Sequence, residues 1–422
     1  MSDSETTTLA RERGPKPGAR PEARLLWLLG PAFVAAIAYV DPGNVAANLT
    51  AGASYGYLLV WVLVAANVMA VIIQYLSAKL GLVTGRSLPE LLGERLPRRR
   101  RLLFWAQAEV IAAGTDLAEV IGGAIALQIL FGVPLPLGGL IVGVVSMVLL
   151  SIQSRRGQRP FEFVIIALLA IIAIGFLAGV VVSPVSWSDA AAGIVPRFVG
   201  TQTVLLAASM LGATVMPHAI YLHSGLARDR HGATLEEPRI RRLLKATRVD
   251  VVLALVLAGT VNVAMLLLAA SSLRGVDGTD TIEGAHAAVV AALGPAVGVI
   301  FGVGLLASGL ASTSVGCYAG STIMAGLLHL RIPLLVRRVV TLIPALVILS
   351  TGFEPTRALV LSQVLLSIGI PFALVPLVKY TSDHSIMGVF ANHRILTVVA
   401  WVVTASIGLL NVVLVVLTVA GP

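Results

Sequence analysis

A carboxylate lies in the middle of the first long apolar stretch of the sequence. Asp41 and Asn44 flank a Pro-Gly pair inside an apolar run over residues 25–53, which can cross a bilayer, since about 20 residues suffice. Proline lacks a backbone N–H and glycine adopts unusual backbone angles, so the helix should break here and leave carbonyl groups without helical partners. Oxygen ligands beside freed carbonyls suit a partly dehydrated cation. The alternative is a proline kink in which Asp41 forms a structural ion pair.

A second break is predicted in the sixth apolar stretch. Pro217 interrupts the middle of this stretch, and Ala213 and Met216 precede it. The carbonyl of Ala213 and the thioether of Met216 add candidate ligands to those of the first break. Thioether sulfur is a soft ligand that Mg²⁺ and Ca²⁺ do not favour, whereas Mn²⁺, Fe²⁺ and later transition metals accept it. The mixed oxygen and sulfur set therefore predicts a transition-metal site; for Met216 alone, the alternative is core packing.

Three further polar side chains in the apolar stretches have more than one interpretation. His218 and His223 follow the second break, and each could carry a proton, bind metal or form a hydrogen bond in the core. Without a cysteine or a third histidine nearby, a zinc site is disfavoured, and we favour proton handling or gating for His218. Gln363, in the tenth stretch, is either an interhelical hydrogen-bonding group or a metal ligand in an occluded state.

The third apolar stretch contains a row of acids. Glu109, Asp116 and Glu119 lie on one helical face because of their spacing, and buried acids in a membrane usually mark ion or proton routes. The candidate basic partners are Arg230, at the inner end of the sixth stretch, and Arg337 and Arg338, at the start of the ninth. We predict a proton pathway to the cytoplasm, with a static ion-pair network as the alternative.

The composition defines the class of protein that carries these residues. The 422 residues are 57% hydrophobic and 12% charged, with a mean hydropathy of +0.94, whereas soluble domains are about 25% charged. An all-α polytopic membrane protein is therefore predicted. The net charge of +9 does not indicate a nucleic-acid partner, because the basic residues fall in short loops between apolar stretches. A single cysteine, Cys317, excludes an internal disulfide and a thiolate cluster.

About eleven membrane spans are predicted from the apolar stretches. Their approximate bounds are residues 25–53, 57–82, 102–130, 137–152, 163–182, 203–226, 249–271, 297–327, 334–350, 358–378 and 396–420. Basic residues concentrate in alternate loops, which predicts a cytoplasmic N-terminus, an outside C-terminus and a location in the plasma membrane. Residues 1–24 are predicted to be a disordered cytoplasmic tail.

The two predicted breaks are five spans apart. Because five is odd, the second group of five spans must enter the membrane from the opposite side, as in the inverted repeats of secondary transporters. We expect a first repeat over residues 25–183, a second over residues 184–380, and an eleventh span with the C-terminus over residues 381–422. In such transporters, paired discontinuous helices mark the substrate site.

Four motifs of the apolar stretches are informative when taken together. They are Ala-Tyr-Val-Asp-Pro-Gly-Asn at 38–44, Gln-Tyr-Leu-Ser-Ala-Lys-Leu-Gly at 74–81, Asp-Leu-Ala-Glu-Val-Ile-Gly at 116–122 and Ala-Thr-Val-Met-Pro-His at 213–218. Together they resemble the Nramp (natural resistance-associated macrophage protein) divalent metal transporters. The resemblance covers the chain from about Gly30 to Pro376. It implies a LeuT-type fold and proton-coupled uptake of Mn²⁺ and Fe²⁺, often with Cd²⁺, Co²⁺ and Zn²⁺ tolerated.

The resemblance also implies roles for individual residues. The family's metal ligands correspond to Asp41, Asn44, the Ala213 carbonyl and the Met216 sulfur, with the Ala38 carbonyl and Gln363 as extra ligands in occluded or inward states. Its proton route corresponds to Asp41, His218, Asp116, Glu119 and Glu109, with Arg230, Arg337 and Arg338 as partners. Two positions depart from the family pattern: Ala219 replaces a common asparagine, and Ser321 follows Gly320 where glutamine is common. These departures concern rate or gating rather than the proposed ligands.

Three other functions are weighed against metal import. An organic-substrate or sodium symporter of similar fold would bind a carboxylate group at a helix N-terminus, which Asp41 does not favour. An intramembrane metalloenzyme would need a pattern such as His-Glu-x-x-His, which the sequence lacks. A passive channel fits paired broken helices less well than alternating access does. The sequence thus predicts a transporter with no enzymatic activity and no resident cofactor. Its predicted partners are divalent transition metal ions, protons and the lipid bilayer, and it is predicted to work as a monomer.

Overall fold

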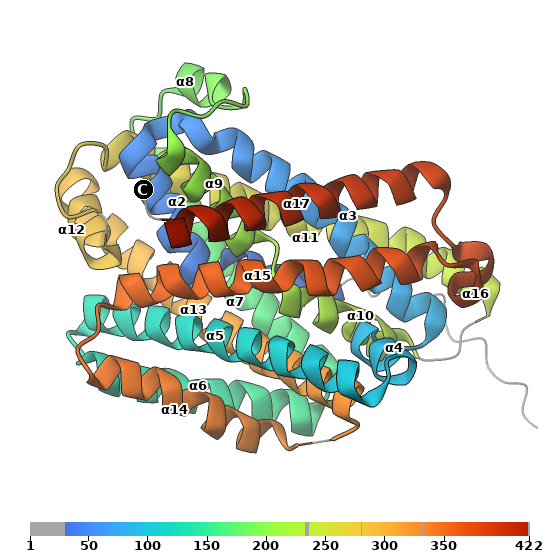
Figure 1. Cartoon of the computed structure of the whole chain (residues 1–422). Coiled ribbons are helices and arrows are strands. Elements are labelled where there is room, and N and C mark those ends of the chain that lie inside the picture. Colours follow the sequence, from blue (N-terminus) through green and yellow to red (C-terminus); the bar gives the residue numbers. More distant parts are fainter. Residues whose placement is uncertain (1–29, 233–235, 280, 331, 421–422) are drawn as a thin grey trace, which may run out of the picture.

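The chain folds as a bundle of helices (Figure 1). The computed structural model describes residues 30–232, 236–279, 281–330 and 332–420, and across these residues the regular structure is helical, with no strand. The predicted tail over residues 1–24 and the first residues of the first span lie outside the described residues. Nine helical segments of the described chain are long and apolar enough to cross a membrane. An all-helical polytopic architecture is therefore confirmed.

Each predicted span corresponds to a helix or to a broken helix. The first span is divided into α1 (Pro31–Ala36), η2 (Ile37–Val40) and α2 (Pro42–Tyr55), and the sixth into α9 (Thr201–Thr214) and α10 (Pro217–His231). The unbroken spans are α3 (Val60–Thr84), α5 (Arg98–Phe131), α6 (Leu135–Arg156), α7 (Gln158–Val182), α11 (Glu237–Ser272), α13 (Pro295–Leu328), α14 (Leu334–Ser350), α15 (Pro355–Ser382) and α17 (Arg394–Ala420). The division of the chain into repeats at residues 183 and 380 stays a prediction.

Shorter helices connect the spans at the two ends of the bundle. One end carries η3 (Gly56–Leu59), α8 (Trp187–Ala192) and α12 (Ile282–Leu293). The other end carries α4 (Leu88–Arg95), α16 (His384–Met387) and η4 (Gly388–Phe390). Figure 1 shows α12 and α4 at opposite ends, with α6 and α14 side by side along one edge.

The two breaks arise from the same backbone rule. In an α-helix the N–H of residue i donates to the carbonyl of residue i−4, so Pro42 deprives the carbonyl of Ala38 of its donor, and Pro217 deprives that of Ala213. At the first break the chain tightens into η2, and Asp41 becomes extended (φ −71°, ψ 167°) before α2 begins. At the second break α9 ends at Thr214, and α10 begins at Pro217.

Neighbouring helices supply hydrogen bonds to the irregular backbone at the first break. Asn262 of α11 donates through Nδ2 to the carbonyl of Tyr39 (2.6 Å), and its Oδ1 accepts from Asn48 of α2 (2.8 Å). Ser308 of α13 donates to the carbonyl of Val40 (2.6 Å). Since a buried carbonyl without a partner is costly, these side chains stabilise the break.

A glycine allows α5 to pack directly against the first break. A Cβ atom on Gly122 would clash with the ring of Pro42, so only glycine permits this approach. Small residues such as glycine let membrane helices pack closely. The contact sets the position of α5 relative to the first break, because the ring of Pro42 lies directly against the α5 backbone.

We expect Asn262→Leu to destabilise the protein by about 1–3 kcal/mol, because the Tyr39 carbonyl would be left buried without its donor and the Asn48 amide would keep only its longer contact with the sulfur of Met265 (3.9 Å). Chemical denaturation of the purified protein in detergent measures this loss. Thr260→Val, on an exposed face of the same helix, is the matched control, because the Thr260 hydroxyl donates to the carbonyl of Val256 within α11 (2.7 Å). Equal midpoints for the two variants would contradict the role of Asn262.

Candidate metal-binding site

One side chain joins the two breaks. Asn44, in the first turn of α2, donates through Nδ2 to Oδ1 of Asp41 (2.6 Å) and to the carbonyl of Ala213 (2.8 Å). Its backbone N–H also donates to Oδ1 of Asp41 (2.8 Å), so the carboxylate caps α2. Asp41, Asn44 and Ala213 are fully buried. The structure therefore brings three predicted ligands together from two segments far apart in the sequence.

The carboxylate at this junction has an oxygen available for further binding. Within the described part of the chain, Oδ2 of Asp41 has no hydrogen-bond partner. Gln363 of α15 places its amide against Gly43, beside the same carboxylate, and its Oε1 is likewise buried without a partner in the described chain. Two oxygen atoms that could bind a cation thus lie buried at the first break.

The remaining predicted ligands are buried on the two broken segments. Ala38 lies in η2, and its carbonyl is the one that Pro42 leaves without a helical donor. Met216 is the residue directly before α10 and is fully buried in the same apolar cluster as Ala38. Thr214 donates to the carbonyl of Met210 (2.7 Å), which stabilises the last turn of α9 before the break. The ligand roles of Ala38, Met216 and Gln363 stay predictions.

The two histidines of α10 have different environments. His218, in the first turn, is buried, and neither ring nitrogen has a hydrogen-bond partner among the described residues. His223 contacts Oε1 of Gln74 through Nδ1 (2.8 Å), and Gln74 donates to the hydroxyl of Tyr39 (2.7 Å). A hydrogen-bonded chain therefore runs from α10 through α3 to η2.

The acids of α5 face α13 and α14. Glu109 pairs with Arg337 (2.7 Å), and Asp116 pairs with Arg338, which is fully buried. Thr313 donates to the Asp116 carboxylate and Ser146 accepts from Arg338 (2.6 Å). The next acid, Glu119, is fully buried against Gly316 of α13, and within the described chain its two carboxylate oxygens have no hydrogen-bond partner.

The structure places Arg230 in a different cluster from the one predicted. Arg230 lies 3.6 Å from Glu162 of α7, rather than among the acids of α5. Asp250 of α11 is part of the same region and accepts from the backbone N–H groups of Gly30 and Ala32 (both 3.0 Å). The sequence interpretation paired Arg230 by its depth alone, and depth does not specify on which side of a helix a partner lies.

Sequence reasoning did not predict the roles of the polar residues that support the site, although Gln74 begins the motif at 74–81. Asn262, Ser308, Thr313 and Gln74 each contact a break or an acid of α5, and Asp250 binds the start of α1. The available signal was a polar residue within an apolar stretch, since such residues usually face protein rather than lipid. That signal identifies the residue but not its partner.

Comparison with known proteins gives the family. A model described as "Natural resistance-associated macrophage protein-like" matches residues 32–417. A protein of Mycobacterium tuberculosis called divalent metal cation transporter MntH is 62% identical over 415 residues, which are 97% of each chain. A protein of the same name from Deinococcus radiodurans is 46% identical over 396 residues, covering 93% of this chain and 90% of that one. This chain belongs to the Nramp family.

Solved structures show the same fold. A manganese transporter of Eremococcus coleocola has a TM-score of 0.84 and 31% identity, over 92% of this chain and 85% of that one. A nucleobase-cation-symport-1 family transporter, at 17% identity, has a TM-score of 0.60 over 92% of this chain and 89% of that one, and this likeness concerns the fold alone. The predicted family and the LeuT-type fold are confirmed, and these relatives are named as transporters rather than enzymes.

The buried pair of Asp116 and Arg338 allows a direct test of the line of acids. Arg338→Gln should destabilise the protein by about 3–5 kcal/mol, because it leaves the Asp116 carboxylate buried without its cation. The double variant Asp116→Asn/Arg338→Gln should lose less free energy of unfolding than the two single variants lose in sum, and we expect this difference to be about 1–3 kcal/mol. Denaturation midpoints of the four proteins measure this coupling, and strictly additive losses would show that the two groups do not interact.

Proposed function

We propose that this protein imports divalent transition metal ions, chiefly Mn²⁺ and Fe²⁺ with Cd²⁺, Co²⁺ and Zn²⁺ tolerated, by proton-coupled alternating access. The observation that carries the proposal is the junction of the two broken helices through Asp41, Asn44 and the Ala213 carbonyl. The names of its relatives, which include divalent metal cation transporters and a manganese transporter, support the same function.

The amide of Asn44 lies where a cation would be expected to bind. Its Nδ2 presents two N–H donors to two oxygen atoms, one from each break. A metal ion that binds these two oxygen atoms would replace the hydrogen bonds from Nδ2. Rotation of the Asn44 amide about its last side-chain bond would then present Oδ1 as a further ligand. Asp41, Asn44, the Ala213 carbonyl and the Met216 sulfur would bind the ion, and the Ala38 carbonyl and Gln363 would join in other states.

The ligand set explains selection against the abundant alkaline earth ions. Oxygen ligands alone would suit Ca²⁺ and Mg²⁺, but the Met216 thioether contributes a contact that these hard ions do not favour. Because Met216 is fully buried, water does not readily replace the sulfur. Selectivity then depends on one side chain in the second break.

The proton route uses the acids that lead away from the first break. We propose that a proton binds Asp41 or His218 and passes to Glu119, Asp116 and Glu109. Arg337 and Arg338 pair with Glu109 and Asp116, so Glu119 is the acid of this row without a paired arginine in the described chain. Its buried oxygens are the ones most able to take up and release a proton.

The distribution of basic residues supports an orientation in the plasma membrane. Arg98, at the start of α5, and Arg155 and Arg156, at the end of α6, lie at the bundle end that carries α4 and α16. Cytoplasmic loops are enriched in arginine and lysine, so this end faces the cytoplasm. In this orientation the N-terminus lies inside and the C-terminus outside. We also propose that the protein works as a monomer.

Transport selectivity provides the test of the site. In proteoliposomes, wild type should take up Mn²⁺ in the presence of excess Ca²⁺ and Mg²⁺, and Asp41→Ala should abolish uptake. Met216→Ala should keep part of the Mn²⁺ uptake but lower discrimination against Ca²⁺ by about tenfold, which is about 1.4 kcal/mol. Met210→Ala, which truncates another buried methionine of the sixth span, is the matched control for lost packing. Unchanged selectivity in Met216→Ala would assign its sulfur to packing alone.

Proton coupling has a separate readout. Glu119→Gln should slow acidification of the vesicle lumen more than it weakens metal binding, because a glutamine at this position cannot take up a proton. A pH dye in the lumen and Mn²⁺ binding to the purified protein measure the two effects independently. Normal acidification by this variant would favour a purely structural role for the acid.

A further inference from the structure

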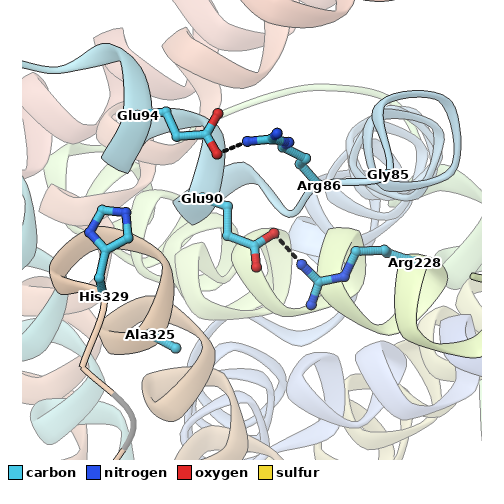
Figure 2. Close-up of a pocket in the computed structure, with 7 residues that line it drawn as sticks. All are labelled: Gly85, Arg86, Glu90, Glu94, Arg228, Ala325 and His329. Carbon is cyan, nitrogen blue, oxygen red and sulfur yellow. Dashed lines mark hydrogen bonds and ion pairs between the residues drawn. The ribbon is translucent and has the colours of Figure 1, made fainter. Parts of the chain in front are cut away.

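Two pockets at opposite ends of the bundle are each lined by two arginines. The pocket at the α4 end has a volume of about 470 Å³, and its polar lining includes Arg86, Glu90, Glu94, Arg228 and His329. Figure 2 shows that each arginine of this pocket faces a carboxylate: Arg86 pairs with Glu94, and Arg228 pairs with Glu90. The guanidinium groups of this pocket therefore already have anionic partners.

The carboxylate of Glu90 remains charged in this arrangement. Its partial burial works toward a higher pKa, but hydrogen bonds from Ser87 and the ion pair with Arg228 together hold the pKa of Glu90 below its usual value. Glu90 also completes a capping box with Ser87 at the start of α4. The positive charge of the pocket is thus balanced from within the chain, and an added anion would have to displace a partner.

The pocket at the other end lacks this balance. It has a volume of about 550 Å³ and is lined by Arg197 and Arg274, with Asp189 and the side chains of Tyr55 and Tyr57. Within the described chain, neither arginine nor Asp189 has a salt bridge or a side-chain hydrogen bond. Two guanidinium groups and one carboxylate leave a net positive charge in the cavity.

The presence of the two arginines at this end is unusual for a membrane protein of this charge pattern. The connections and helix starts at the end that carries α8 and α12 contain three arginines, namely Arg197, Arg274 and Arg357. Loops that face outward are normally poor in basic residues. Two of these three, Arg197 and Arg274, lie at one cavity.

Several contacts give this cavity a defined shape. The backbone N–H of Ser186 donates to the hydroxyl of Tyr57 (3.0 Å), and the N–H of Trp61 donates to the carbonyl of Gly193 (2.9 Å), so the connection from α7 to α9 is attached to η3 and α3. Gly56 has a positive φ of 60°, and Arg274 lies against it, where a side chain would crowd the guanidinium. The arginines therefore line a pocket bounded by ordered backbone.

We propose that this pocket is a binding site for a phosphate or carboxylate anion on the outer face of the protein. Guanidinium groups bind such oxyanions through paired N–H donors, and the volume lies within the range of about 300–1,000 Å³ typical of small-molecule sites. Asp189 favours an anion that also carries a hydroxyl group, since a carboxylate accepts hydrogen bonds but repels a second bare anion. The anion is either a free solute, such as citrate or inorganic phosphate, or the headgroup phosphate of a lipid.

Binding to the purified full-length protein tests the proposal without reference to transport. Citrate and inorganic phosphate are titrated at constant ionic strength, with chloride as the balancing anion, and the unfolding midpoint and the heat of binding are recorded in lipid-depleted detergent. Wild type should show a saturable stabilisation by at least one anion. The double variant Arg197→Gln/Arg274→Gln should bind at least tenfold more weakly, whereas Arg357→Gln, an exposed arginine at the same end but outside the pocket, should bind as wild type does.

A second arm separates the two sources of the anion. If free anions have no effect in detergent, the unfolding midpoints in nanodiscs with and without phosphatidylglycerol are compared. Stabilisation of wild type by this lipid that is lost in the double variant identifies a headgroup phosphate and supports the site. Equal responses of the double variant and wild type, or a wild type that responds to neither free anion nor anionic lipid, would overturn the proposal. Unfolding midpoints in chloride alone confirm that the variants, altered at exposed positions, are folded.

Discussion

The loss of two backbone hydrogen bonds in the middle of a membrane protein governs the rest of this structure. Pro42 and Pro217 each remove the donor that a carbonyl four residues earlier requires. Within a bilayer, water cannot replace the missing donor, so the surrounding helices must bury the irregular backbone and supply partners. Asn262 and Ser308 do so beside the first break, and Asn44 reaches the Ala213 carbonyl at the second.

The same constraint relates structure to the proposed function. A backbone carbonyl that has lost its helical donor is an oxygen atom at a defined position that could bind a cation, and the Asp41 carboxylate lies beside the Ala213 carbonyl, since both accept from Asn44. The amide group of Asn44 connects Asp41 to the Ala213 carbonyl of α9, beside an apolar cluster to which both α2 and α9 contribute. If a cation replaces that amide as the bridging positive group, its arrival and departure alter the contact between the two broken helices, as alternating access requires.

Charge is distributed in this molecule according to local pairing rather than net composition. Arg337 and Arg338 are buried because acids of α5 face them, and Arg86 and Arg228 have carboxylate partners around the pocket at the α4 end. Arg197 and Arg274 share a cavity in which the described chain provides no such partner. The overall charge of +9 reveals none of these differences, because pairing depends on which helix faces which.

The sequence alone determined the fold class, the positions of the spans and the location of both breaks. These features depend on local chemistry: runs of apolar residues predict membrane helices, and a proline within such a run removes a hydrogen bond wherever the helix lies. The sequence also placed Glu109, Asp116 and Glu119 on one helical face, since helical periodicity requires no knowledge of the neighbours.

Only the tertiary structure decided which side chains meet. Arg230 contacts Glu162 instead of the acids of α5, and Asn262 bonds to Tyr39, 223 positions away, because the rotation and packing of each helix set these contacts and no local pattern encodes them.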